Sequence, residues 1–126
     1  MFFWIVLVCL IVLLAYIRLA PSDAARWHVS LVGKTEKTFA GGVIRSIDVG
    51  ITALDKVVQQ SGARVLAGSA AEGHVTYIAR TKLIGFPDYV TVQTVDGKTM
   101  IYGRLRFGRS DLGVNGKRID AWLAQL

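Results

Sequence analysis

An uncharged, strongly apolar run opens the chain and ends at Arg18. Continued to residue 20, it has the roughly twenty residues that an α-helix needs to cross the hydrocarbon core of a bilayer. Trp4 and Tyr16 lie near its two ends, where interfacial aromatic side chains are common. The run therefore predicts a transmembrane anchor over residues 1–20, and any folded domain must form from the residues that follow.

A cleaved signal peptide is the second interpretation of this run. Signal peptides begin with basic residues and end in a cleavage site of small residues. No Lys or Arg precedes the run, and a cut after Ala20 would have Arg18 three positions before it and Pro21 directly behind it. The later Ser22-Asp23-Ala24 matches a cleavage site better. The residues favour an uncleaved anchor and leave cleavage open.

The rest of the chain suffices for one domain and not for two. The chain has 126 residues and one cysteine, Cys9, which lies inside the apolar run. A single cysteine makes neither an internal disulfide nor a cysteine-based metal site. We therefore expect a small domain whose stability depends on its hydrophobic core.

The net charge of +6 favours an anionic partner, either nucleic acid or phospholipid headgroups. We expect the membrane lipid bilayer as partner, because an anchored domain always has lipid beside it, and we leave a membrane-protein partner open. Nucleic acid is not expected, since the basic strands carry no interleaved exposed aromatic side chains and no helix is basic like a recognition helix. The oligomeric state is left unassigned.

Basic residues on either side of the apolar run bear on which side of the membrane holds the domain. Four of them, Arg18, Arg26, Lys34 and Lys37, follow the run, and none precedes it. By the positive-inside rule this charge distribution places the domain in the cytoplasm.

Helical periodicity is clearest over residues 46–61. There an apolar stripe is formed by Ile47, Ile51, Leu54 and Val58. Ser46 is a suitable N-cap, and Gly62 ends the pattern. A second helix is predicted over residues 115–126 with Asn115 as its N-cap, and one face of it carries Ile119, Trp122, Leu123 and Leu126.

Alternating and β-branched residues predict strands at 43–44, 64–67, 74–83, 89–95 and 99–107. Asp96-Gly97, between the last two, is the strongest hairpin signal in the chain. Consecutive strands with short connections predict an antiparallel meander.

The fold class expected is therefore α+β. An N-terminal transmembrane helix is followed by a small antiparallel sheet of about four to five strands, with two helices packed on one face of the sheet. We expect an anchor over residues 1–20, a connector over residues 21–37 and an α+β domain over residues 38–126.

Residues suited to catalysis are sparse. His28 and His74 are far apart in sequence and have no partner at metal-ligand spacing, so no metal site is expected. Ser110-Asp111 offers a hydroxyl and a carboxylate, but a catalytic triad would need one of these histidines. Asp111 is better interpreted as a turn or capping residue. No cofactor is indicated, and the residues lean towards a protein that is not an enzyme.

Basic residues concentrate on two of the predicted strands. Arg80 shares a strand face with Lys82, and Arg104 shares one with Arg106, so these side chains could gather with Arg109. In one interpretation Arg80 and Arg106 pair with Asp88 and Asp111 and hold the loops that leave the strands. In the other, the remaining positive charge binds an anion or an anionic membrane surface. We predict the pairing, with a structural role before a functional one.

Two stretches go beyond such general patterns. Residues 77–88 read YIARTKLIGFPD, and residues 106–115 read RFGRSDLGVN, with Arg118 after them. Together they resemble the family known as domain of unknown function 1499, which is found in bacteria and plastids. The pattern of that family is a strand bearing Arg, then Gly-Phe-x-Asp, then a strand, then Ser-Asp-Leu-Gly-Val-Asn before a final helix. The resemblance covers roughly residues 57–126.

This resemblance implies a set of candidate binding residues at the motif positions of the family. They are Arg80, Asp88, Arg106, Asp111, Asn115 and Arg118. Tyr89 stands where many members have a second acidic residue, and the cysteine pair that many carry ahead of the domain is missing here. Members often have export or lipoprotein signals, so the resemblance favours the periplasmic side of the inner membrane, against the count of basic residues. The family has no agreed activity, so the resemblance implies a fold and no mechanism.

Two functions follow as hypotheses. The first is a membrane-anchored, non-enzymatic binding or accessory module that contacts anionic lipid or a membrane complex. The second is an enzyme or small-ligand carrier that uses the Arg/Asp cluster. Aspartates tied to arginines would favour the first, and an open pocket lined by both kinds of residue would favour the second.

Overall fold

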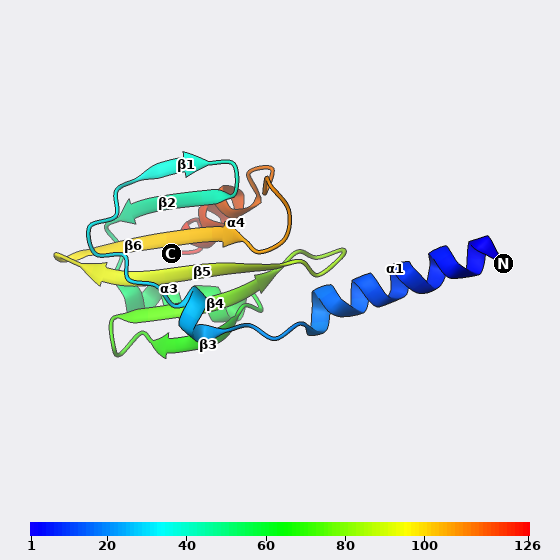
Figure 1. The fold of residues 1–126 in the computed structure, drawn as a ribbon. Helices are drawn as coiled ribbons and strands as arrows, with labels where there is room; N and C mark the ends of the chain where they lie inside the picture. Colours follow the sequence, from blue (N-terminus) through cyan, green and yellow to red (C-terminus); the bar gives the residue numbers. More distant parts are fainter.

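The computed structural model describes residues 1–126, the whole chain. Helix α1 (Phe2–Leu19) projects away from a domain that contains the other elements (Figure 1). It is long and apolar enough to cross a membrane, a property that signal sequences near an N-terminus share. The domain combines one antiparallel sheet with short helices, so the expected α+β class is confirmed.

Six strands form the sheet, where four to five were expected. They are β1 (Lys37–Phe39), β2 (Gly42–Ile47), β3 (Arg64–Ser69), β4 (His74–Arg80), β5 (Pro87–Val95) and β6 (Lys98–Leu105). All neighbouring strands are antiparallel, in the order β1-β2-β6-β5-β4-β3. The predicted meander is therefore present, and a β1–β2 hairpin extends it beyond β6. The unexpected strand is β1, which at three residues is too short to show periodicity.

The β5–β6 hairpin turns at the predicted pair. Asp96 and Gly97 both have positive φ, 51° and 78°, as a two-residue hairpin turn of the primed type requires. Val95 pairs with Lys98 across the turn. This hairpin lies at the end of the sheet that is far from α1, and the β4–β5 loop lies at the end near it (Figure 1).

The helix expected over residues 46–61 begins later. Helix α3 spans Ile51–Gln60 with Gly50 at the N-cap, and Ser46 lies in β2 opposite Met100. The prediction of Ser46 as N-cap was wrong, because residues 42–47 form ladder hydrogen bonds to β6 that the local helical period does not reveal. Ile47 still packs against the main core, from the end of a strand.

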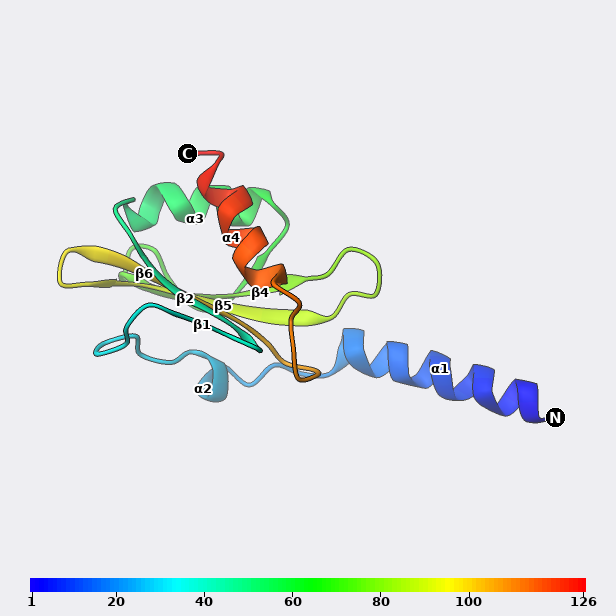
Figure 2. The same ribbon diagram turned by 90° about the horizontal axis from the view of Figure 1, so that it is seen from above.

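Both α3 and α4 (Val114–Leu123) cover the same face of the sheet (Figure 2). The main core lies between them and the strands, and it includes Leu54, Val58, Tyr77, Ile101, Ile119 and Trp122. The Tyr77 hydroxyl donates a hydrogen bond to the Asp55 carboxylate of α3, and burial raises the pKa of Tyr77. Leu126 was expected on the buried face of the last helix, but it lies beyond the helix and is exposed.

Residues 21–36, here called the strap, cover the opposite face of the sheet. The strap includes the short helix α2 (Ala24–Trp27), which lies across the sheet from α3 and α4 (Figure 2). Leu31 of the strap is fully buried in a second core with Ile44 and Met100. The segment expected as a connector is thus packed along the domain.

Candidate functional site

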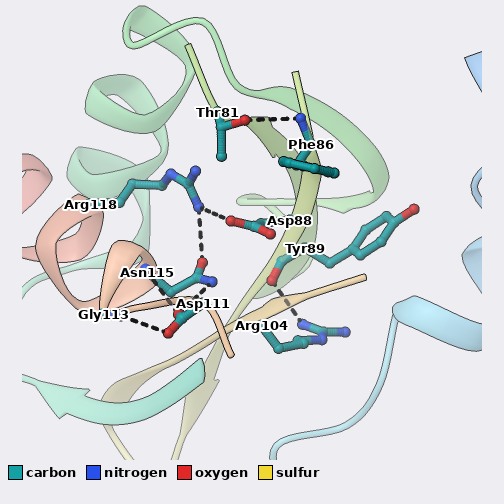
Figure 3. A network of polar contacts seen from close by, with 9 residues as sticks. All are labelled: Thr81, Phe86, Asp88, Tyr89, Arg104, Asp111, Gly113, Asn115 and Arg118. Carbon is teal, nitrogen blue, oxygen red and sulfur yellow. Dashed lines mark hydrogen bonds and ion pairs between the residues drawn. The ribbon is translucent and has the colours of Figure 1, made fainter. Parts of the chain in front are cut away.

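Four of the six candidate residues meet where α4 begins and β5 begins: Asp88, Asp111, Asn115 and Arg118 (Figure 3). Arg118 of α4 donates a hydrogen bond to the Asp88 carboxylate at 3.0 Å. The side chains are 13% and 5% exposed, so this ion pair lies largely out of water. Burial raises the pKa of Asp88 and the adjacent Arg118 opposes this rise. The pair ties α4 to the sheet.

Asp111 holds the start of α4. Its carboxylate accepts hydrogen bonds from the backbone N–H groups of Gly113 at 2.9 Å and Asn115 at 3.1 Å, and from the Asn115 side chain at 3.0 Å. A carboxylate that accepts these N–H groups caps the helix and complements its dipole. The capping interpretation of Asp111 is therefore confirmed, and Asn115 is not the N-cap. Asn115 is fully buried, and its side chain accepts a hydrogen bond from Arg118 at 2.9 Å.

The predicted pairs of Arg80 and Arg106 with aspartates are wrong. Asp88 lies opposite Ala79 on the neighbouring strand and faces α4, whereas Arg80, one residue further along, belongs to the other set of alternating positions. Asp111 lies beneath α4, while Arg106 reaches the strap face. Strand alternation separates Arg80 from Asp88, and Asp111 does not meet Arg106 because its carboxylate is held by the start of α4.

Arg80 and Arg106 hold the junction between α1 and the domain instead. Arg80 donates to the backbone carbonyl of Gly85 at 2.9 Å and to that of Ile17, near the end of α1, at 3.3 Å. Arg106 donates to the carbonyl of Pro21 at 2.9 Å and to the Tyr89 hydroxyl at 3.0 Å. These contacts fix where the domain begins relative to the apolar helix.

Arg104 is a buried residue whose role the sequence did not reveal. It is 5% exposed, and its guanidinium donates to the Trp27 carbonyl, to Thr91 Oγ1 at 2.8 Å and to the Tyr102 carbonyl at 3.1 Å. Its guanidinium carbon lies 4.4 Å from the centre of the Tyr102 ring. Burial lowers the pKa of Arg104 to about 10, so it stays charged at neutral pH. Arg104 therefore fastens the strap to the sheet with neutral acceptors and no carboxylate.

Two histidines lie beside this arginine. The rings of His28 and His74 are stacked with their centres 3.9 Å apart. His28 Nδ1 is hydrogen bonded to Thr76 Oγ1 at 2.8 Å, and His74 Nε2 to the Val29 carbonyl at 2.8 Å. Burial and the adjacent His74 lower the pKa of His28. These contacts are structural, and the pair has no third ligand that would complete a metal site.

A pocket of about 700 Å³ lies between α4, the end of β4 and the turn that leads into β3, and Arg118 is part of its lining. One wall is a face of α4 at helical spacing, formed by Val114, Lys117, Arg118, Ala121, Trp122 and Gln125. The basic residues of the lining are Arg64, Arg80, Lys82, Lys117 and Arg118, and the lining contains no Asp, Glu, His or Cys.

The pocket therefore offers cations and no carboxylate, imidazole or thiol. Of the six candidate residues, only Arg80 and Arg118 line it, and Asp88, Arg106, Asp111 and Asn115 do not. Arg64 and Lys117 were not singled out from the sequence. The sequence held one indication of Lys117 as a lining residue. The spacing of Val114, Lys117 and Ala121 on α4 places a lysine between two small apolar side chains on one helix face.

Four of the six motif residues thus lie together around the start of α4: Asp88, Asp111, Asn115 and Arg118. The model of the family described as "Protein of unknown function (DUF1499)" matches residues 34–126. The chain belongs to this family. The DUF1499 match covers the sheet, α3 and α4, and extends further towards the N-terminus than the motifs alone indicated. No curated protein matches the chain in a sequence comparison.

Proposed function

We propose that this DUF1499 protein is a membrane-anchored, non-enzymatic binding module whose domain lies with its α1 end on an anionic bilayer surface. In this proposal α1 spans the membrane and stays on the mature protein. The observation that carries the proposal is the set of apolar side chains exposed at the end of the domain from which α1 leaves.

Two loops carry these side chains. Leu83 and Leu112 are 88% and 84% exposed, and Ile84 between β4 and β5 is 36% exposed. Both loops lie at the end of the sheet nearest to α1 (Figure 1). The ring of Tyr16 in α1 is in edge contact with that of Phe107, 5.9 Å between centres, so the anchor and the second loop touch. Apolar side chains of this exposure fit the boundary between headgroups and acyl chains.

Basic residues flank the same apolar side chains. Lys82 precedes Leu83, Arg109 lies three residues before Leu112, and Arg18 at the end of α1 is adjacent to Gly85. Each basic residue near an anionic membrane surface contributes about 1 kcal/mol of attraction. Charge and apolar exposure at one end together favour lipid over a soluble partner.

An enzyme or carrier built on the Arg/Asp cluster is less well supported. Asp88 is paired with Arg118, and Asp111 is occupied by the backbone of α4. Neither carboxylate lines the pocket. The carboxylates therefore serve structure, and what remains for binding is positive charge.

Site-specific fluorescence tests this proposal on the full chain. Cys9→Ser removes the only cysteine, and Leu83→Cys, Leu112→Cys and the distal control Lys98→Cys are each labelled with an environment-sensitive dye. In vesicles containing phosphatidylglycerol, the dyes at positions 83 and 112 should shift to the blue and be quenched by lipid-borne quenchers, while the dye at 98 should not. Equal quenching at all three positions, or none at 83 and 112, would overturn the proposal.

The side of the membrane is part of the same proposal. We place the domain in the periplasm, supported by the export signals that are frequent in the DUF1499 family, while the basic residues that follow α1 oppose it. A reporter fused after Leu126 decides between the two sides. Activity of a periplasm-specific reporter is expected, and activity of a cytoplasm-specific reporter alone would reverse the assignment.

A further inference from the structure

The basic pocket is positioned to take a ligand from the membrane surface. Arg80 lines the pocket, and its side chain donates to the Ile17 carbonyl near the end of α1, so this residue borders both the pocket and the anchor. Lys82, another lining residue, lies in the loop that carries the exposed Leu83. The side of the pocket formed by Arg80 and Lys82 is therefore next to the anchor.

Charge is distributed unevenly in the pocket. Five cations line it with no acidic side chain among them, and only Arg118 has a carboxylate partner, Asp88. Lys117 and Arg64 are exposed and make no side-chain hydrogen bond or ion pair. Unpaired cations facing one cavity repel each other, and an anion removes that repulsion. Arg presents a planar fork that suits phosphate oxygens.

The remaining lining is apolar and has room for more than a small ion. Ala63, Ile78, Ala79, Val114, Ala121 and Trp122 contribute this surface. The volume of about 700 Å³ is in the range of pockets that hold ligands of drug size. An inorganic anion would satisfy the cations and leave the apolar wall uncovered.

We propose that this pocket binds an anionic phospholipid, with its phosphodiester held by Arg64, Lys82 and Lys117 and the start of its acyl chains against Ala121 and Trp122. This inference rests on the proposed function, since the lipid comes from the bilayer that holds α1. It assigns the domain a specific lipid site in addition to a membrane-facing end.

Native mass spectrometry of the full chain in a neutral detergent tests the inference. The probes are short-chain phosphatidylglycerol, phosphatidylcholine with the same chains, and glycerol 3-phosphate. Phosphatidylglycerol should bind at one site per chain. The double variant Arg64→Glu/Lys117→Glu should weaken this binding about tenfold or more, because each basic residue contributes about 1 kcal/mol near an anionic lipid and the glutamates add repulsion. Both positions are exposed, so the variant keeps its fold.

Two further variants separate charge in the pocket from charge elsewhere. Lys34→Glu/Lys98→Glu makes the same change in net charge at exposed positions outside the pocket lining and should leave binding unchanged. Ala121→Trp fills the exposed wall of α4 without changing charge and should abolish lipid binding. Equal loss of binding in the control and the pocket variant would overturn the inference.

The probes distinguish the sources of the phosphate. Binding of phosphatidylcholine as tight as that of phosphatidylglycerol would contradict selection by charge. Binding of glycerol 3-phosphate as tight as that of the lipid would show that the apolar wall contributes nothing, and it would overturn the assignment to a lipid. If phosphatidylglycerol does not bind but the dyes at positions 83 and 112 are still quenched in vesicles, only the lipid site in the pocket is ruled out. If the lipid binds and those dyes are not quenched, only the membrane-facing end is ruled out.

Discussion

The two faces of the sheet are covered in different ways. On the face beneath α3 and α4, apolar side chains such as Leu54, Ile101 and Ile119 meet, and they are fully buried. On the strap face, separate hydrogen bonds to strap groups are formed by Thr76, Thr91, Gln93 and Arg104. One face is held by the burial of apolar area, and the other combines a small apolar core around Leu31 with polar contacts to irregular backbone.

Each face also contains one arginine that is largely out of water, and the polar partners of the two arginines differ. Arg118 faces a carboxylate, Asp88, whereas Arg104 faces carbonyl and hydroxyl oxygens. Removing the partner of a buried ion pair leaves an uncompensated charge and is strongly destabilising. A buried charge among neutral acceptors is stabilised only while the backbone holds those acceptors in place. The same substitution at both positions therefore measures how the two faces differ.

The largest effect is expected for Arg118→Met. It leaves the Asp88 carboxylate buried without its cation, which should cost about 3–5 kcal/mol of folding free energy near neutral pH. The loss should be smaller at low pH, because the pKa of Asp88 is already raised and protonation removes the uncompensated charge. Denaturant titration of the full chain in detergent at two pH values measures both. A loss that does not depend on pH would mean that Asp88 is not the group left unpaired.

A smaller effect is expected for Arg104→Met. The carbonyls of Trp27 and Tyr102 would lose their donor, at a cost of about 1–3 kcal/mol, and the strap should loosen while the helix face stays folded. Trypsin should then cleave faster after Arg26 and Lys34, both exposed in the strap. Lys56→Met, at an exposed position of α3, is the control. If Arg104→Met left the stability unchanged or raised it, Arg104 would not be the residue that fastens the strap.

The smallest effect concerns pH. The pKa of His28 in the folded chain lies below its ordinary value of 6.5, so the unfolded chain binds the proton first. This contribution to stability is fully present above pH 6.5 and is lost as the pH falls below it. The melting temperature of the full chain should therefore fall more between pH 7.5 and 5.5 than that of His28→Gln. The opposite contribution of Asp88, whose pKa is raised, is common to both proteins and cancels in the comparison.

The helix face was largely predictable from the sequence, and the strap face was not. Hydrophobic spacing at Leu54 and Val58, or at Ile119 and Trp122, reports burial directly. The polar row of Thr76, Thr91 and Arg104 looks like a solvated face, and only the strap, which has no periodic pattern, turns it into an interior. Alternation correctly placed Arg104 and Arg106 on one face, but it did not show what covers that face.

The candidate residues show a similar limit. The motifs correctly pointed to the start of α4, where Asp111, Asn115 and Arg118 meet. Pairing each arginine with the nearest aspartate in sequence failed, because strand alternation turns Arg80 away from Asp88 and because Asp111 caps α4. The pocket could not be foreseen, since its lining comes from β4, α4 and the turn after α3.

Hydrogen–deuterium exchange of the full chain in lipid nanodiscs tests directly whether the strap is part of the folded domain. The Leu31 N–H donates to Gln93 at 2.6 Å, and the His28 N–H to the Ala24 carbonyl at 2.8 Å. Residues 24–31 should therefore exchange far more slowly than an unfolded segment and be released by Arg104→Met, with α3 still protected. Exchange of this segment at the unfolded rate in the unmodified protein would mean that the domain hangs from α1 on a loose tether, and it would contradict the account.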